Sequence, residues 1–342
     1  MKRISTIIKH LLMMFVLIGA AEVARAQYSE ANAINNSGTI AGGTCISGCE
    51  FFKSFVLHKN DFQTFATLGG PASDAFGIND AGEIVGQADT DQIDLEAGGA
   101  FISLAFFIDR DGVVHNLGTL SGYKYSQAFA INNTGLIVGR VYNGNPEDPV
   151  APMRAVIYED GVMRQIGTLG GTSSMAFAVN DLGSVVGAAR TTSGEQHAFL
   201  YYGGVMHDLD TLGGNLSTAR GINSRGQIVG GSRLAIPGQR HAFVFEFGVM
   251  RDLGTLGGNF SEAFAINDSG QIVGQAETAT GERHAFLYTN GRMVDLGTLG
   301  GTFSVAFAIN NRGEIVGQSE TTIGDFHAFL YKDGVMIDLG GD

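Results

Sequence analysis

Tryptophan is absent from the 342-residue sequence, and basic residues are scarce: Lys and Arg together number 21, against 34 Asp and Glu. The lack of tryptophan removes the commonest side chain for stacking on sugar rings and counts against a glycan-binding site. The formal net charge of −13 repels phosphate backbones and anionic lipid surfaces. We therefore expect no nucleic-acid binding and no adhesion to anionic membranes, and cationic or basic partners are favoured.

Long hydrophobic runs are also missing, except for one near the start. Residues 11–21 are apolar, follow a basic segment and precede Ala24-Arg25-Ala26, which predicts a signal peptide over residues 1–26 that is cleaved before Gln27. The run is too short to cross about 30 Å of hydrocarbon. Its removal takes away four basic residues and one acidic residue, so the net charge falls from −13 to −16. We expect a monomer that is secreted or periplasmic and does not insert into the membrane.

Cysteine is limited to Cys45 and Cys49. In an oxidising compartment, a local disulfide is the simplest interpretation of this spacing. A redox-active or metal-binding pair is the alternative, but two sulfur ligands are too few for structural zinc, which takes four ligands.

What the sequence does contain is one unit repeated seven times, most clearly at residues 259–301. Within that copy, residues 263–267, 271–274, 284–288 and 292–296 are predicted strands. The first pair and the second pair are joined by the tight turns Asn267–Gly270 and Asn290-Gly291. The Asn that opens the first turn recurs every 43 to 53 residues, at Asn35, Asn79, Asn132, Asn180, Asn223, Asn267 and Asn310.

Four strands joined by tight hairpins form one small antiparallel sheet, which predicts an all-β fold: a seven-bladed β-propeller of four-stranded blades in a single domain, residues 27–342. A β-helix or solenoid is the alternative, but it stacks its coils without tight hairpins. The sequence does not decide how the ring closes: side-chain packing could close it, or residues 31–35 could complete the last blade. The units are placed at about residues 28–70, 71–122, 123–171, 172–214, 215–258, 259–301 and 302–342.

The later units carry a recurring His-Ala-Phe triplet and the sequence Asp-Leu-Gly-Thr-Leu-Gly-Gly. The triplets begin at His197, His241, His284 and His327. These motifs resemble the HAF-repeat family, whose members are described as extracellular repeat proteins of bacteria without an established activity. The resemblance covers the whole mature chain, is looser in the first three units, and implies export without implying any catalytic residue.

No cofactor is expected. The repeated histidines stand in separate blades, too far apart to share a zinc ion at 2.0–2.1 Å, so we predict a structural role such as a hydrogen bond to the next blade. Calcium is an alternative suggested by the Asn-Asp-x-Gly turns, but no calcium-loop motif supports it.

Two units have longer loops between their second and third strands, which should open onto the same rim of the ring. A tolerated surface insertion is the alternative to a binding role. The candidate ligand-binding residues in these loops are Asp89, Asp91, Asp94 and Glu96 in residues 87–103, and Glu147 and Asp148 in residues 140–153.

A further candidate is Arg220, which lies on a predicted inner strand. The residue aligned with it in the clearest unit is Phe264, and the residue aligned with it in the first unit is Asn32. Arg220 could line the channel and meet an anionic ligand, or it could pair with a neighbouring carboxylate.

No catalytic residue set stands out from the repeat. The leading hypothesis is a non-enzymatic binding or scaffold module for an unknown extracellular or periplasmic protein or ligand. The alternatives are a propeller hydrolase or lyase with its site over the channel, and a structural cell-surface or matrix component.

Overall fold

The structure, a computed structural model, describes residues 28–45, 51–65, 68–144 and 152–340. These residues form 28 strands and contain no helix. Within these ranges, no helix is therefore long and apolar enough to cross a membrane. The predicted signal peptide, residues 1–26, lies outside the described residues.

The strands pair antiparallel in chain order, in groups of four that we number 1 to 7. Groups 1 to 3 hold β1 (Tyr28–Ile34), β2 (Ile40–Cys45), β3 (Lys53–His58), β4 (Asp61–Thr64); β5 (Gly69–Ile78), β6 (Ile84–Asp94), β7 (Ala100–Ile108), β8 (Val114–Gly118); and β9 (Tyr125–Ile131), β10 (Ile137–Tyr142), β11 (Met153–Glu159), β12 (Val162–Gln165).

Groups 4 to 7 follow the same order. They hold β13 (Gly170–Val179), β14 (Val185–Thr191), β15 (Gln196–Tyr202), β16 (Val205–Asp208); β17 (Gly213–Ile222), β18 (Ile228–Leu234), β19 (Arg240–Glu246), β20 (Val249–Asp252); β21 (Gly257–Ile266), β22 (Ile272–Thr278), β23 (Arg283–Thr289), β24 (Arg292–Asp295); and β25 (Gly300–Ile309), β26 (Ile315–Thr321), β27 (Phe326–Lys332), β28 (Val335–Asp338).

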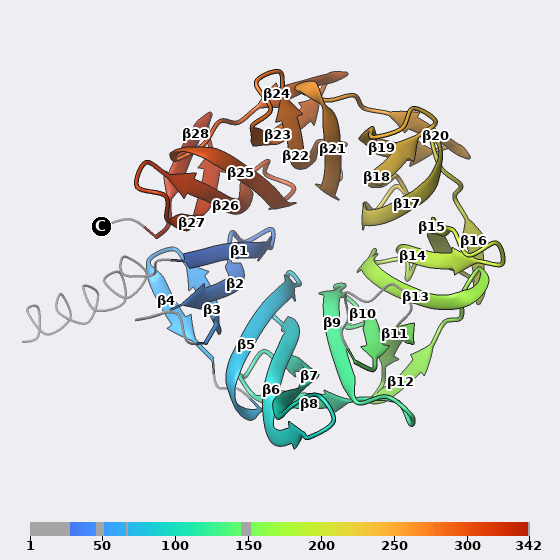
Figure 1. Cartoon of the computed structure of the whole chain (residues 1–342). Helices are drawn as coiled ribbons and strands as arrows, with labels where there is room; N and C mark the ends of the chain where they lie inside the picture. Colours follow the sequence, from blue (N-terminus) through green and yellow to red (C-terminus); the bar gives the residue numbers. More distant parts are fainter. Residues whose placement is uncertain (1–27, 46–50, 66–67, 145–151, 341–342) are drawn as a thin grey trace, which may run out of the picture.

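Figure 1 shows the groups arranged around a common centre, with the first strand of each group innermost and the short fourth strand outermost. The turns between first and second strands lie at one end of the central channel, which we call the turn side. The described links between groups and the described loops between second and third strands lie at the other end, which we call the link side. Each first strand therefore runs along the channel from the link side to the turn side.

The first and last groups are also built from strands in chain order. β28 pairs with β27, and β1 pairs with β2 along its length. The contact of β1 with the last group is one parallel bridge, Tyr28 to Phe326. Similar single bridges connect group 4 to 5, 5 to 6 and 6 to 7, so that five groups form a 20-stranded sheet, while groups 2 and 3 are separate four-stranded sheets. No strand of the described residues is shared between groups 7 and 1 in an antiparallel pairing.

Side-chain hydrogen bonds join neighbouring groups at the turn side. The Asn at each first turn donates its Nδ2 to the backbone carbonyl of the corresponding Asn in the next group, at 2.9 to 3.1 Å. Its Oδ1 accepts backbone N–H groups two and four residues ahead, as Asn267 does from Ser269 and Gln271. Gly270, with φ of 80°, completes that turn at no steric cost. The repeated Asn is therefore both a turn residue and an inter-group contact.

A second set of bonds uses a serine of each first strand. Ser261 Oγ accepts the backbone N–H of Ala242 in the preceding group at 2.8 Å and donates to the carbonyl of Gly254. Equivalent bonds to the preceding third strand recur at every junction, including the one from Ala328 to Ser29 between groups 7 and 1. The sequence interpretation missed this serine, although it recurs in all seven units.

The hydrophobic core lies between adjacent groups. A fully buried Phe of each third strand stands at its centre in six groups, and Val156 replaces it in group 3. Glycine in the second strand makes room for this ring: a Cβ at Gly187 would lie 2.8 Å from the ring of Phe199. Each cluster combines residues of two groups, so a group buries its faces only against its neighbours.

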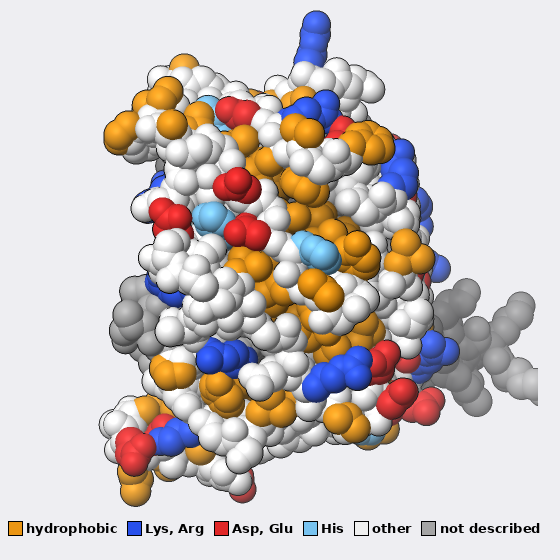
Figure 2. All heavy atoms as spheres, turned by 90° about the vertical axis from the view of Figure 1, so that its right-hand side faces the viewer, with side chains coloured by type: hydrophobic (Ala, Val, Ile, Leu, Met, Phe, Trp, Pro, Cys, Tyr) orange, Lys and Arg blue, Asp and Glu red, His pale blue; other side chains and the backbone are white. Residues whose placement is uncertain are grey.

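The outer side of the ring is mixed in character. Figure 2 shows a band of hydrophobic side chains there, between scattered charged and histidine side chains. The first residues of several fourth strands, including Val205 and Val249, are more than half exposed.

Candidate functional site

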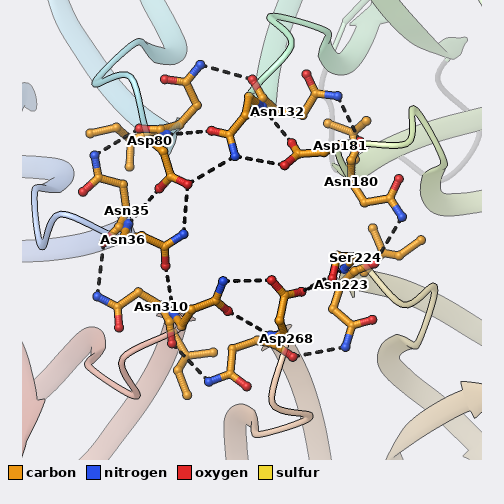
Figure 3. Close-up of a pocket in the computed structure, with 18 of the residues that line it drawn as sticks. Asn35, Asn36, Asp80, Asn132, Asn180, Asp181, Asn223, Ser224, Asp268 and Asn310 are labelled. Carbon is orange, nitrogen blue, oxygen red and sulfur yellow. Dashed lines mark hydrogen bonds between the residues drawn. The ribbon is translucent and has the colours of Figure 1, made fainter.

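A bowl of about 210 Å³ opens at the turn side of the channel (Figure 3). We call the seven asparagines that open the first turns the ring Asn residues. The wall of the bowl is formed by each ring Asn, by the aliphatic residue before it and by the residue after it. The residues that follow the ring Asn are Asn36, Asp80, Asn133, Asp181, Ser224, Asp268 and Asn311.

The three carboxylates of this bowl are engaged in hydrogen bonds to neighbouring groups. Asp80 accepts from the backbone and side chain of Asn36, both at 2.9 Å, and Asp268 accepts from Ser224 and Asn311. Burial alone would raise the pKa of Asp268, but these hydrogen bonds hold it below its usual value. The bowl is therefore explained by contacts between strand groups, and it needs no ligand.

Further into the channel, an aromatic layer lines the first strands. Phe76, Phe129 and Phe177 contact one another in sequence, with ring centroids 5.3 to 5.7 Å apart, and Phe264 contacts Phe307 at 5.9 Å. Arg220 and Asn32 interrupt this layer, as the sequence predicted for their positions. Each of the two polar residues lies beside a carboxyl group that the sequence interpretation did not single out.

Arg220 lies in the channel wall between two phenylalanines. Its guanidinium carbon is 4.3 Å from the ring centroid of Phe177 and 5.9 Å from that of Phe264. Its Nε donates to Glu262 Oε1 at 3.3 Å, and Arg240 donates to the same oxygen at 2.8 Å. Arg220 therefore lies in the channel wall and pairs with a carboxylate that it shares with Arg240.

Arg140 on β10, the second strand of group 3, is a further cation beside this aromatic layer, with its guanidinium carbon 5.5 Å from the ring centroid of Phe129, and the sequence interpretation missed it. Its Nε donates to Gln127 Oε1 at 2.6 Å, and its Nη1 donates to the thioether sulfur of Met175 at 3.2 Å. Among the described residues it forms no ion pair. Burial, together with the positive charge of Arg220, lowers the pKa of Arg140.

On the side of groups 1 and 2, Glu30 and Asp74 form a pair of hydrogen-bonded carboxyl groups. Asn32 donates its Nδ2 to Asp74 Oδ1 at 3.2 Å and to Glu30 Oε1 at 3.3 Å. A Cβ at Gly43 would lie 2.6 Å from Asp74 Oδ1, so that glycine makes room for the pair. Burial raises the pKa of both groups, that of Asp74 strongly, and the charge of Glu30 raises it further. Burial and the neighbouring charge therefore favour a state in which one of the two carboxyl groups is protonated.

The candidate residues of the first long loop do not converge on one point. Asp94 is buried and accepts hydrogen bonds from Tyr125 at 2.8 Å and from Lys124 at 3.1 Å. These bonds, that of Tyr125 first, lower the pKa of Asp94, and burial with this contact raises that of Tyr125 to about 12. Glu96 is exposed and bonds the same lysine at 2.5 Å. Asp94 thus anchors the loop of group 2 to group 3.

The same loop borders a groove of about 700 Å³ at the link side, which Asp94 and Glu96 line together with Lys124 and Asn143. Asp89 is half-buried and accepts from Ser103, whereas Asp91 is exposed. Of the second loop, the candidates Glu147 and Asp148 lie outside the described residues.

Cys45 is disulfide-bonded. Cys49, the other cysteine of the sequence, lies outside the described residues.

The repeated histidines lie on the outer part of the groups. In each of groups 4 to 7, His Nδ1 lies 2.8 to 3.0 Å from both carboxylate oxygens of an Asp in the fourth strand. Each histidine thus has a hydrogen-bond partner, as a structural role requires. The prediction of a bond to the next blade is wrong, because each Asp lies on the fourth strand of the same group, next to the third strand that holds the histidine. In the described parts of the chain, no three His, Cys, Asp or Glu side chains are grouped to hold a metal ion.

A family model described as a protein of unknown function (DUF3466) matches residues 118–249. No curated protein sequence matches the chain. Among solved structures, the chain is similar to the β-propeller domain of the trilobed protease from Pyrococcus furiosus, with a TM-score of 0.58 and 10% identity over 92% of this chain and 96% of that one.

Similar structures also include two larger peptidases. An acylaminoacyl peptidase from Pyrococcus horikoshii has a TM-score of 0.56 and 12% identity over 93% of this chain and 53% of its own. A puromycin-hydrolyzing peptidase from Mycobacterium tuberculosis has a TM-score of 0.58 and 12% identity over 94% and 55%. The chain spans about half the length of these two peptidases. At such identities the likeness concerns the fold alone, and the fold of this chain is an all-β propeller.

Proposed function

We propose that this chain is an exported, non-enzymatic β-propeller of seven blades that binds a ligand in its central channel. The strand groups 1 to 7 would be the blades, closed without a shared strand. The bonds Asn310–Asn35 and Ala328–Ser29 support this closure, because they repeat the bonds of the other junctions. The propeller domain of the trilobed protease is described as having an open velcro topology, and we propose the same for this chain.

The binding proposal depends on one observation: the residues that line the channel differ from the repeat pattern at the place where charged side chains are clustered. The residues that align with Arg220 in other groups are mostly Phe, whereas the position of Glu262 is acidic in three groups and varied in the rest: Glu30, Asp74, Gln127, Met175, Thr218 and Val305. Since closing the ring requires none of these charges, and partly buried charges are costly to desolvate, their retention favours a binding role. Departures from a regular pattern gather at functional sites.

Export is supported by the signal-peptide pattern of residues 1–26 and by the resemblance of the His-Ala-Phe units to the HAF-repeat family. The proposed ligand is therefore an extracellular or periplasmic molecule. We propose that the chain acts as a monomer, because its blades would bury their core faces against one another.

Affinity capture tests this function directly. Immobilised residues 27–342 are exposed to bacterial culture medium and periplasmic extract, and retained proteins and small molecules are identified by mass spectrometry. Three proteins are compared: the parent, Arg140→Gln/Arg220→Gln, and the exposed-arginine control Arg292→Gln. A ligand retained by the parent and the control but lost from the double variant supports the proposal. Identical retained sets for all three would place binding outside the channel.

A hydrolase or lyase is the second candidate, favoured by the carboxyl pair Glu30 and Asp74, since such pairs supply general acids and bases. It predicts turnover of an exported substrate that Asp74→Asn abolishes. Retention of a captured molecule without chemical change would favour the binding module.

A further inference from the structure

We infer that the ligand of this channel carries an anionic group, a carboxylate or a phosphate, which lies between Arg140 and Arg220. The inference rests on the proposed function and specifies the chemistry of the ligand. It follows from the partners of the two guanidinium groups, from the charge balance around them and from the surface between them.

The protein provides few hydrogen-bond acceptors for the guanidinium group of Arg140. A guanidinium carries five N–H donors, and Arg140 uses its Nε toward Gln127 and one Nη1 donor toward the sulfur of Met175. A thioether is a weak acceptor, and no described carboxylate pairs with this side chain. Because a polar group that is removed from water without a hydrogen-bond partner costs free energy, an acceptor supplied from outside the chain would complete the site.

Arg220 adds to the positive charge on the same wall. Its Nε contact with Glu262 is long, at 3.3 Å, and its terminal nitrogens have no hydrogen-bond acceptor among the described residues. Glu262 also pairs with Arg240, so its single negative charge is divided between two arginines. Together, Arg140, Arg220 and Arg240 outnumber Glu262 by two charges, in a protein whose net charge is −13.

The two guanidinium groups flank one segment of β13. Arg140 reaches Met175, and Arg220 lies over Phe177, two residues further along the strand. The guanidinium carbon of Arg140 also lies 5.0 Å from the ring centroid of Tyr142 and 5.5 Å from that of Phe129. An anionic group placed between the guanidinium groups would therefore have its apolar part against these rings. This geometry favours an organic anion with a flat apolar body over an inorganic ion.

Four naphthalene probes test the inference by isothermal titration calorimetry with residues 27–342: 2-naphthoate, 2-naphthyl phosphate, neutral 2-naphthol and cationic 2-naphthylmethylamine. We expect the two anions to bind more tightly than naphthol and the amine not to bind. The comparison of naphthoate with naphthyl phosphate distinguishes the two anionic groups. Arg140→Gln and Arg220→Gln should each weaken anion binding about ten- to a hundredfold, and Arg292→Gln should leave it unchanged.

Arg140→Gln is the decisive variant, because it leaves no described carboxylate unpaired, and its thermal unfolding midpoint verifies folding. Anion binding that is equal in the parent and Arg140→Gln would overturn the inference, as would an amine that binds as tightly as naphthoate. Binding of naphthol or the amine that is lost in Phe177→Ala would leave the channel as the ligand site and reject only its anionic chemistry. Failure of all four probes would also reject the anion assignment, while the capture experiment separately decides the proposed function.

Discussion

The side-chain amide of Asn310 donates to the backbone carbonyl of Asn35 at 3.1 Å, across 275 residues of sequence. This bond completes a cycle in which each ring Asn contacts the next strand group. Asn310 also satisfies its own turn, where its Oδ1 accepts the N–H groups of Arg312 and Glu314. The contact between the ends of the chain is thus chemically the same as the internal ones.

Asn310→Ala should destabilise the protein by about 2–3 kcal/mol, because it leaves a buried carbonyl and two turn N–H groups without their partner. Urea unfolding followed by circular dichroism measures this change. The exposed-residue control Asn215→Ala should stay within about 0.5 kcal/mol of the parent. Equal stability of both variants would show that the Asn cycle does not hold the ring together.

Asp74→Asn should reduce the loss of folding stability that we expect for the parent protein as the pH rises. The folded-state pKa of Asp74 is raised by burial and by Glu30, so its contribution to stability is full below the unfolded pKa and is lost as pH rises through the folded pKa. We expect the variant to raise the melting temperature at pH 8 by about 2–4 °C, or ~1 kcal/mol, and to have less effect at pH 4. Calorimetry across this range measures it, and the exposed Asp91→Asn is the control. A parent whose stability does not fall with rising pH would contradict a protonated carboxyl group in this pair.

Glu314 should have the opposite pH dependence. Burial alone would raise its pKa, but hydrogen bonds from Lys332 and Asn310 lower it to about 2. Its contribution is therefore present above the unfolded pKa and is lost as pH falls toward about 2. Glu314→Gln should cost about 1–2 kcal/mol at pH 7 and much less at pH 3, as measured by urea titrations at both values. The same cost at both pH values would indicate a packing effect rather than an ionic one.

The His–Asp pair of groups 4 to 7 should be transferable to group 1. Lys53 and Thr64 occupy there the positions of His284 and Asp295, since the pairings Phe55–Thr64 and Phe286–Asp295 are equivalent. The double variant K53H/T64D should be more stable than the sum of its single variants by about 0.5–1 kcal/mol. A double-mutant cycle in urea measures this coupling, and additive effects would show that the pair has no energetic role.

Export predicts that the full-length chain, produced in a bacterium with a secretion pathway, is recovered outside the cytoplasm with Gln27 at its N-terminus. N-terminal sequencing measures the cleavage site. Thiol labelling of the recovered protein should detect no free cysteine, since Cys45 is disulfide-bonded. Retention in the cytoplasm with residues 1–26 intact would reject the export proposal.

Much of this architecture can be predicted from local patterns. Ile272-Val273 and the turn at Asn267–Gly270 predict a strand and a reversal wherever they recur, because β-branched residues favour strands and glycine accepts a positive φ. Arg220 and Asn32 were recognisable as channel residues by alignment of the units. These are inferences about single units, and each needs only residues that are close in sequence.

Contacts between units depended on how the sheets meet. Asp74 contacts Glu30 across 44 residues, because sheets arranged around a centre bring their first strands together there. Arg140 on β10 and Arg220 on β17 both contact β13, which belongs to the group between them. The pairing of β23 with β24 inside one sheet decided that His284 bonds Asp295 of its own group. The approach of group 3 to group 2 decided that Tyr125 and Lys124 bond Asp94. Sequence periodicity specifies which side chains point away from a strand, but only the packing of whole sheets determines which of them meet.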